Sequence, residues 1–309
     1  MRAVQQDIFG DADVLKLVER PDPVPLPTEI LVRVKAAAIN PVEAYIRSGA
    51  FPVLGQPPFI LGWDVSGVVE GLEPGVNRFK IGDEVYGMPL FPRAANGYAE
   101  KVTGPSRHFA AKPRSLDHIH AAALPLVGLT AWQSLVDVAQ VEAGQRVLIH
   151  AGAGGVGHVA VQIAKARGAY VITTASAAKL DFVRSLGADE VIDYRNVDFA
   201  EKVKGIDVVF ETVGGETAER SLRTLKPGGL FVTIVDRRNA ALAEKTRQAG
   251  LRFAGVAVEP DHHGLEELTR LVDEGKLKVH VAKTFPLEQV ADAHRFLATK
   301  PKGKVVLIP

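Results

Sequence analysis

The sequence contains no cysteine among its 309 residues. It therefore has no disulfide, no thiol nucleophile, no iron–sulfur cluster and no cysteine-ligated zinc site. The nine histidines include no pair with the H-E-x-x-H spacing of a helical zinc site. The adjacent pair His262-His263 lies between Asp261 and Gly264, and we expect it to form a solvated turn. Any catalysis is thus expected to proceed without a thiol and without a metal.

Long apolar runs and a strong net charge are also missing. No stretch approaches the roughly 20 apolar residues that a membrane helix needs, and Met1–Leu17 lacks the basic-then-apolar pattern of a secretion signal. The 37 basic residues balance the 36 acidic ones, so no bulk field favours nucleic acid or an anionic membrane as partner. These absences favour a cytoplasmic location.

The first third of the chain combines β-branched residues with glycine and proline, which is typical of a compact β-rich domain. Strands are expected at 30–36, 65–70 and 84–86, where alternating or short apolar segments are bounded by glycines. Proline at every second position from Pro21 to Pro27 favours an extended connector.

From about residue 118 the pattern changes to short apolar strands that alternate with helices. The expected strands are 146–150, 170–174, 190–192, 207–211 and 230–235, and the expected helices are 156–167, 179–186 and 216–225. Such alternation predicts an α/β fold with a parallel sheet and helices on both faces.

The tail is expected to form helices at 265–274 and 287–298 and a last strand at 304–308. We expect this strand to return to the N-terminal domain, because that domain has too few helices to cover its own sheet.

A glycine-rich segment follows the strand at 146–150 and opens the next helix. It reads Gly152-Ala153-Gly154-Gly155-Val156-Gly157 and fits G-x-G-x-x-G in the βαβ context that makes the motif specific. The first glycine permits a tight turn, the second lets the backbone approach a pyrophosphate, and the third lets helix and strand pack closely. The alternative, a purely structural turn, is disfavoured by this context. The segment therefore predicts a dinucleotide site.

The end of the next strand indicates which dinucleotide binds. NAD-specific sheets usually place Asp or Glu there for the ribose 2′-hydroxyl, but residues 173–179 contain no acid. Ser176 can donate a hydrogen bond to a 2′-phosphate and Lys179 can supply the charge. Ser176 as a helix cap with a solvated Lys179 is the alternative, and both can hold at once. NADP(H) is the predicted cofactor.

Taken together, the chain resembles the zinc-independent quinone oxidoreductases (ζ-crystallin type) of the medium-chain dehydrogenase/reductase family. Besides the glycine motif, the resemblance rests on ordered segments along the full length: 40–49 (NPVEAYIRSG), 62–67 (GWDVSG), 82–87 (GDEVYG), 128–132 (GLTAW) and 303–307 (GKVVL). It implies a GroES-like β-barrel domain at 1–118 with 262–309, a Rossmann domain at 119–261, and a site in the cleft between them.

Two departures from zinc-dependent relatives remove metal ligands. Those relatives place a cysteine where this chain has Asn40, and Gly-His-Glu where it has Gly62-Trp63-Asp64. The cysteine-rich lobe that binds structural zinc is absent as well. The segment after Ser176 is about one residue shorter than in ζ-crystallin relatives, which leaves the phosphate contacts open.

The resemblance also assigns roles to single residues. Asn40 and Tyr45 would line the substrate side, Thr130 would lie near the nicotinamide, and Tyr194 would contact the adenosine phosphate. Two alternatives stay open: Asn40 as a turn residue before Pro41, and Tyr45 as a core aromatic with a satisfied hydroxyl.

We therefore expect hydride transfer from NADPH to a quinone or an α,β-unsaturated carbonyl, with Tyr45, Asn40 or backbone amides stabilising the charge that develops on oxygen. A 2-alkenal (enone) reductase is the closest alternative, and a non-catalytic NADPH-binding protein of the crystallin or RNA-binding kind is the other. The apolar segment Leu251–Val258 is expected to be an edge strand that pairs in a homodimer. An internal strand covered by the tail helices is the alternative.

Overall fold

The computed structural model describes residues 1–309 and divides them into two compact units. The first contains Met1–Leu129, Glu259–Glu274 and Val279–Pro309, and the second contains Thr130–Val258 with Gly275–Lys278. These units follow the packing of the backbone. The functional domain limits expected above, 1–118 with 262–309 and 119–261, remain a prediction.

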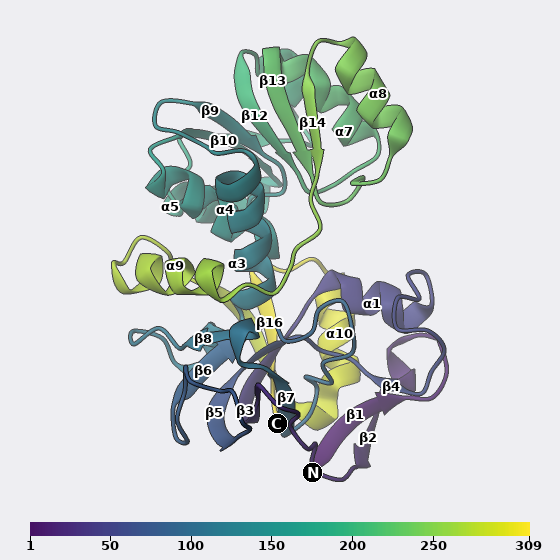
Figure 1. Ribbon diagram of the computed structural model, residues 1–309. Helices are drawn as coiled ribbons and strands as arrows, with labels where there is room; N and C mark the ends of the chain where they lie inside the picture. Colours follow the sequence, from purple (N-terminus) through teal and green to yellow (C-terminus); the bar gives the residue numbers. More distant parts are fainter. The chain divides into compact units, whose positions relative to one another are not determined.

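The first unit contains two sheets (Figure 1). The larger has seven strands, six of them in the order β15 (Val281–Pro286), β16 (Lys304–Ile308), β3 (Glu29–Ile39), β5 (Asp64–Leu72), β6 (Glu84–Gly87) and β8 (Phe109–Ala111), with β7 (Lys101–Pro105) also paired to β3. The smaller is antiparallel, in the order β2 (Lys16–Glu19), β1 (Arg2–Gln6) and β4 (Phe59–Ile60). The last strand pairs with β3, which confirms that the tail returns to the N-terminal part of the chain.

The first unit also contains α-helices and 3₁₀ turns. They are α1 (Pro41–Ser48), α2 (His118–Ala122), the first part of α3 (Pro125–Trp132), α9 (His262–Asp273) and α10 (Val290–Ala298), with 3₁₀ turns η1 (Ala12–Val14), η2 (Ser106–His108) and η6 (Leu287–Gln289). The Pro21–Pro27 segment forms no helix or strand, as expected of an extended connector.

The expected turn at His262-His263 is wrong. Both residues belong to the first turn of α9, and His262 is buried. Asp261 caps the helix, because its carboxylate accepts the amides of His263 (3.0 Å) and Gly264 (2.8 Å). Capping by Asp261 stabilises a helix that begins at His262, despite the turn-forming residues on either side.

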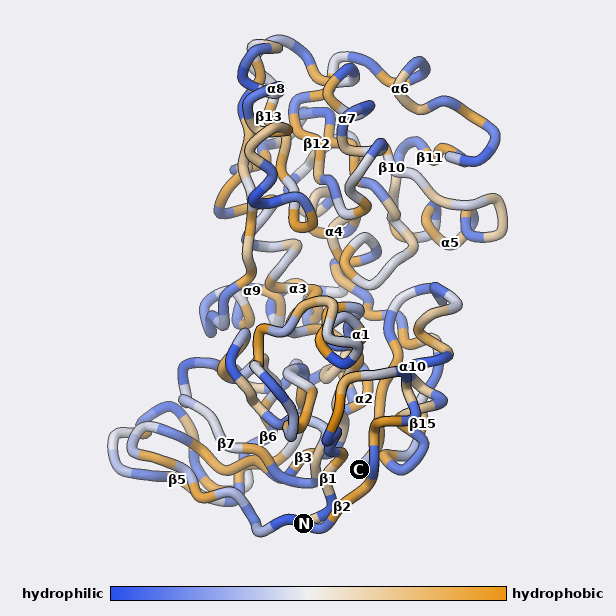
Figure 2. Tube along the Cα trace, turned by 90° about the vertical axis from the view of Figure 1, so that its right-hand side faces the viewer, coloured by the Kyte–Doolittle hydropathy of each residue, from blue (hydrophilic) through white to orange (hydrophobic).

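The second unit is built on one parallel sheet of six strands. Their order is β11 (Glu190–Asp193), β10 (Tyr170–Ala175), β9 (Arg146–Ile149), β12 (Ile206–Glu211), β13 (Leu225–Thr233) and β14 (Arg252–Gly255). Chain order reverses between β9 and β12, so this is the doubly wound Rossmann arrangement, with its switch point between these two strands. The α/β class expected from the alternation of elements is confirmed. Figure 2 shows the corresponding alternation of apolar and hydrophilic stretches along the chain.

Helices and turns connect these strands. They are η3 (Gln133–Val138, a π-helix), α4 (Gly155–Ala166), η4 (Ala177–Lys179), α5 (Leu180–Ser185), α6 (Phe199–Lys202), α7 (Glu216–Ser221), η5 (Leu222–Thr224) and α8 (Ala240–Gln248). One sheet face packs on α6, α7 and α8 through a single apolar cluster that includes Leu148, Val209, Phe231 and Leu242. No helix of either unit is both long enough and apolar enough to cross a membrane.

Candidate functional site

The glycine segment forms a tight loop between β9 and α4, and two positions of this loop have room for glycine only. A Cβ on Gly152 would lie 2.1 Å from Thr173 Oγ1 of β10, and one on Gly157 would lie 2.2 Å from the carbonyl oxygen of Ala151. The close approach of β10 therefore requires glycine at position 152. This requirement is additional to the tight turn expected from the motif. At Gly154, the residue that caps α4, the nearest atom to a Cβ is 3.3 Å away.

The loop presents unused amides to the carboxyl edge of the sheet. The first turn of an α-helix has no intrahelical acceptors for its N–H groups, and α4 begins at Gly155 and Val156. Ala153 precedes this turn and is almost fully buried. Amides at a helix N-terminus favour an anion. Together with the tight glycine loop, these amide donors fit the pyrophosphate of a dinucleotide.

The ends of β10 and β11 carry the residues expected to contact the adenosine phosphate. Ala175 and Asp193 are partners in the parallel register, so Ser176 and Tyr194 follow neighbouring strands at the same sheet edge. Ser176 occupies the cap position of η4, but its side chain makes no capping hydrogen bond. Lys179 ends the same turn, and Tyr194 is 52% exposed. The structure thus brings Ser176, Lys179 and Tyr194 to one edge of one sheet.

Thr130 lies elsewhere in the same unit. It is buried in α3, where the unit begins.

In the first unit, the residues expected on the substrate side lie on or beside α1. Asn40 precedes the helix in an extended conformation, Pro41 is its first residue, and Gly49 ends it with a φ of 83°. Tyr45 projects from the helix with 60% of its surface exposed, and its hydroxyl makes no hydrogen bond in the protein. The alternative of a core aromatic does not apply.

Asn40 is fully buried in a polar network with two other strands. Its Nδ2 donates to Asp64 Oδ2 at 3.0 Å, and its Oδ1 accepts from the Lys304 ammonium. Lys304 Nζ also lies 3.2 Å from Asp64 Oδ2, while Asp64 Oδ1 accepts the amide of Leu126 at 2.7 Å. Burial raises the pKa of Asp64, and the Lys304 ammonium opposes that shift. Trp63, also buried, is held by a 2.7 Å bond from Nε1 to a backbone carbonyl.

A second buried acid, Glu43, lies in the first turn of α1. Glu43 Oε2 accepts the Asn40 amide at 2.7 Å and the Tyr98 hydroxyl, while Oε1 has no hydrogen-bond partner in the protein. Tyr98 in turn lies 3.3 Å from His294 Nε2. Burial raises the pKa of Glu43 to about 7 and lowers that of His294 to about 3. Sequence reasoning missed this cluster, although Asn40 followed three residues later by Glu43 is a capping signal.

Comparison with known proteins places these features in a family. Residues 26–114 match the model of the alcohol dehydrogenase GroES-like domain, and residues 186–307 match that of the zinc-binding dehydrogenases. Human (Homo sapiens) quinone oxidoreductase is 32% identical over 326 residues, covering 100% of this chain and 98% of that protein. The NADPH-dependent alkenal/one oxidoreductase of Arabidopsis thaliana chloroplasts is 37% identical, covering 100% of this chain and 80% of its own.

A solved structure agrees in fold as well as sequence. Escherichia coli quinone oxidoreductase in complex with NADPH matches with a TM-score of 0.89 and 31% identity, covering all of both chains. The chain therefore belongs to the quinone oxidoreductase (ζ-crystallin-like) family of the medium-chain dehydrogenases/reductases.

Proposed function

We propose that this protein transfers hydride from NADPH to a quinone or an α,β-unsaturated carbonyl compound, and that it does so without zinc. It is an oxidoreductase of the NADPH-dependent quinone- and enone-reducing type. The observation that carries the proposal is the glycine loop at the switch point of the parallel sheet, next to a β10 end that has no acidic residue.

When bound, NADPH supplies the hydride, and the protein must hold the cofactor. The first-turn amides of α4 would hold the pyrophosphate. Ser176, Lys179 and Tyr194 would surround the 2′-phosphate of the adenosine, and Thr130 would support the nicotinamide end. Lys179 is the one cation of this set, so it would contribute most to discrimination between NADPH and NADH.

Charge that develops on the acceptor oxygen needs a donor from the protein or from water. Tyr45 is exposed and its hydroxyl is unengaged, whereas the Asn40 amide is buried and bonded to Asp64 and Lys304. This difference supports Tyr45 as the donor and Asn40 as the residue that fixes the start of α1. Conjugated acceptors suit such a site, because delocalisation already spreads the negative charge.

The residues at the former metal positions support a zinc-free reaction. Asn40, Trp63 and Asp64 replace the ligand types of zinc-dependent relatives, and each is held by a hydrogen bond inside the protein. No group of three or more His, Asp or Glu side chains is arranged to hold a metal ion.

A substrate panel tests the function. NADPH consumption would be followed with simple quinones, 2-alkenals, cyclic enones and saturated aldehydes, each with and without chelator. We expect turnover with quinones or enones, no turnover with saturated aldehydes, and no loss on chelation. The ratio of kcat/KM for quinones and enones would identify the preferred class. Cofactor binding without turnover of any acceptor would instead favour a non-catalytic NADPH-binding protein.

We also propose a homodimer built on the edge of the six-stranded sheet. β14 is the last strand in the sheet order and pairs only with β13, so one row of its backbone groups has no partner strand. An exposed edge of this kind favours pairing with another chain. Light scattering should give twice the 33.1 kDa chain mass. A monomer at micromolar concentration would contradict the dimer.

A further inference from the structure

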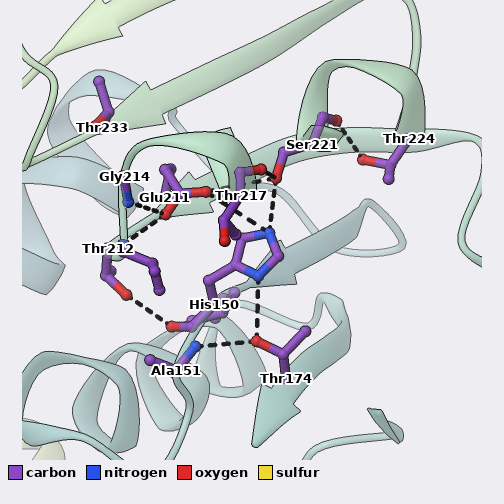
Figure 3. Close-up of polar contacts among 12 residues, drawn as sticks. His150, Ala151, Thr174, Glu211, Thr212, Gly214, Thr217, Ser221, Thr224 and Thr233 are labelled. Carbon is purple, nitrogen blue, oxygen red and sulfur yellow. Dashed lines mark hydrogen bonds and ion pairs between the residues drawn. The ribbon is translucent and has the colours of Figure 1, made fainter. Parts of the chain in front are cut away.

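A buried histidine links the ends of β9 and β10 to helix α7 at the switch point of the parallel sheet (Figure 3). His150 follows β9 and is 1% exposed. Its Nδ1 lies 3.1 Å from Thr174 Oγ1 of β10, and its Nε2 lies 2.8 Å from Ser221 Oγ of α7. None of these three residues belongs to the glycine motif.

The hydroxyl partners determine the tautomer of this imidazole. Ser221 Oγ has acceptors of its own, the carbonyl oxygen of Thr217 at 2.7 Å and Glu211 Oε2 at 3.4 Å, so it accepts from His150 Nε2–H. Thr174 Oγ1 accepts the amide of Ala151 at 3.1 Å, so its proton is free to go to His150 Nδ1. Burial lowers the pKa of His150 to about 3. The ring is therefore neutral and carries its proton on Nε2.

The same contacts hold one peptide group at the start of the glycine loop. The His150 carbonyl accepts the Thr212 hydroxyl at 2.8 Å, and the Ala151 amide of the same peptide donates to Thr174. Ala151 has a φ of 53°, a left-handed conformation that costs about 1–2 kcal/mol for a residue with a Cβ. Its carbonyl then accepts the amide of Gly154 at 2.9 Å. The orientation of this peptide thus sets the path of the loop into α4.

Glu211 lies on the Ser221 side of the ring and makes no hydrogen bond to Thr174. Its Oε1 accepts the amides of Val213 at 2.5 Å and Gly214 at 3.0 Å, while Oε2 is 3.8 Å from His150 Nε2 (Figure 3). The Thr174 side of the imidazole therefore serves the glycine loop, and the Ser221 side anchors the ring to α7.

We propose that His150 is a positioning residue for NADPH. Through Thr174 it holds the His150–Ala151 peptide in place, and this keeps the first-turn amides of α4 where the pyrophosphate binds. The inference rests on the proposed use of NADPH and adds two residues, His150 and Thr174, that touch no substrate atom. Their loss should weaken cofactor binding while leaving the hydride step intact once the cofactor is bound.

The hydrogen bonds on the two sides of the ring can be tested separately by substitution. His150→Asn places an amide where Nδ1 lies and preserves the hydrogen bond to Thr174. His150→Gln reaches the Nε2 position and preserves only the hydrogen bond to Ser221. Thr174→Val removes the hydroxyl and Thr174→Ser keeps it. Thr246→Val is the matched control, because Thr246 is equally buried and donates to the Leu242 carbonyl at 2.6 Å in α8.

NADPH dissociation constants, kcat at saturating NADPH and melting temperatures would be measured for the full-length chain. We expect Thr174→Val and His150→Gln to raise Kd about five- to fifteenfold, the equivalent of one hydrogen bond, with kcat changed by less than about twofold. Thr174→Ser and His150→Asn should stay within about threefold of wild type. Thr246→Val should lower the melting temperature and leave Kd unchanged.

Unchanged Kd in Thr174→Val and His150→Gln would overturn the inference while NADPH use stands, and so would an equal loss of affinity in Thr246→Val. A wild-type chain that does not bind NADPH would overturn the inference and the proposed function together. If the His150 variants do not fold, the Thr174 pair carries the test. ¹⁵N NMR of the wild type gives an independent readout: a ring protonated on Nδ1, or one that titrates between pH 5 and 8, contradicts the assigned tautomer.

Discussion

Asn40 Nδ2 and Asp64 Oδ2 are joined by a buried hydrogen bond of 3.0 Å, at the two positions where the resemblance implies a cysteine and a glutamate in zinc-dependent relatives. Lys304 contacts both side chains from the last strand of the chain. The carboxylate is thus balanced by an ammonium group and an amide within the protein. The result is a buried polar network that joins Asn40, the residue between β3 and α1, to β5 and β16 and so fixes the start of α1.

Removing the cation of this network should be costly. Lys304→Met leaves the Asp64 carboxylate buried and unbalanced, and we expect a loss of about 3–5 kcal/mol in the free energy of unfolding. Urea denaturation at pH 7.5 measures it. Lys226→Met is the control, because Lys226 pairs with Asp207 at the surface and such a pair contributes about 1 kcal/mol or less. Equal effects of the two substitutions would show that the buried network is not stabilising.

Glu43 should make stability fall as pH rises. Burial raises its pKa from 4.5 to about 7, so the folded protein holds the proton more tightly than the unfolded chain does. The resulting stabilisation is complete below pH 4.5, declines between pH 4.5 and 7, and is absent above pH 7. It amounts to on the order of 3 kcal/mol.

Glu43→Gln cannot titrate and isolates this contribution. The free energies of unfolding of wild type and variant would be measured from pH 4.5 to 8. We expect their difference to shift in favour of the variant as pH rises, and to level off above pH 7. Buried His294 also titrates in the unfolded chain, but it contributes to both proteins and cancels in the difference. Parallel curves for the two proteins would contradict the raised pKa.

Lys179 should decide the cofactor preference. Lys179→Ala removes the charge expected beside the 2′-phosphate, and we expect a loss of about 1–3 kcal/mol in binding NADPH. NADH lacks that phosphate, so its affinity serves as the internal control and should not change. Fluorescence titration gives both dissociation constants. Equal affinities of the wild-type protein for NADPH and NADH would contradict the assignment.

Tyr45→Phe tests the proposed donor, because it keeps the ring and removes only the hydroxyl. We expect kcat to fall about ten- to a thousandfold with NADPH affinity unchanged, since a single donor to a developing oxyanion can contribute that much. The side chain is exposed, so the melting temperature should not change. A rise in KM at constant kcat would instead show that Tyr45 only shapes the substrate site.

The sequence predicted the parallel sheet well, for a physical reason. Its strands are buried on both faces and therefore appear as short, continuous apolar segments such as Val208–Phe210, which match β12 closely. The glycine loop was predicted equally well. At Gly152 and Gly157 a Cβ would lie 2.1–2.2 Å from a neighbouring atom, so only glycine fits at these positions. Element ends were less accurate: β3 extends to Ile39, three residues beyond the expected strand.

The buried polar residues could not be predicted. Glu43, His150 and His294 are single titratable residues, and their neighbours along the chain do not reveal which polar groups they contact. Their environment comes from strands and helices distant in sequence, as when His150 meets Ser221 across 71 residues. Likewise, the sequence suggested Asn40 as a substrate contact, but its burial depends on Lys304, which lies 264 residues away.

Hydride transfer to a conjugated acceptor is the direct test of the proposed function. Chelator-treated enzyme would be given NADPH deuterated at C4 and either a quinone or a 2-alkenal, with NADPH oxidation followed by absorbance and the products analysed by mass spectrometry. We expect the chelator-treated enzyme to remain fully active. When the alkenal is reduced, we expect deuterium on the β-carbon of the saturated aldehyde product. No oxidation of NADPH above the enzyme-free rate with any quinone or enone, or activity that returns only when zinc is added, would contradict the proposed reaction.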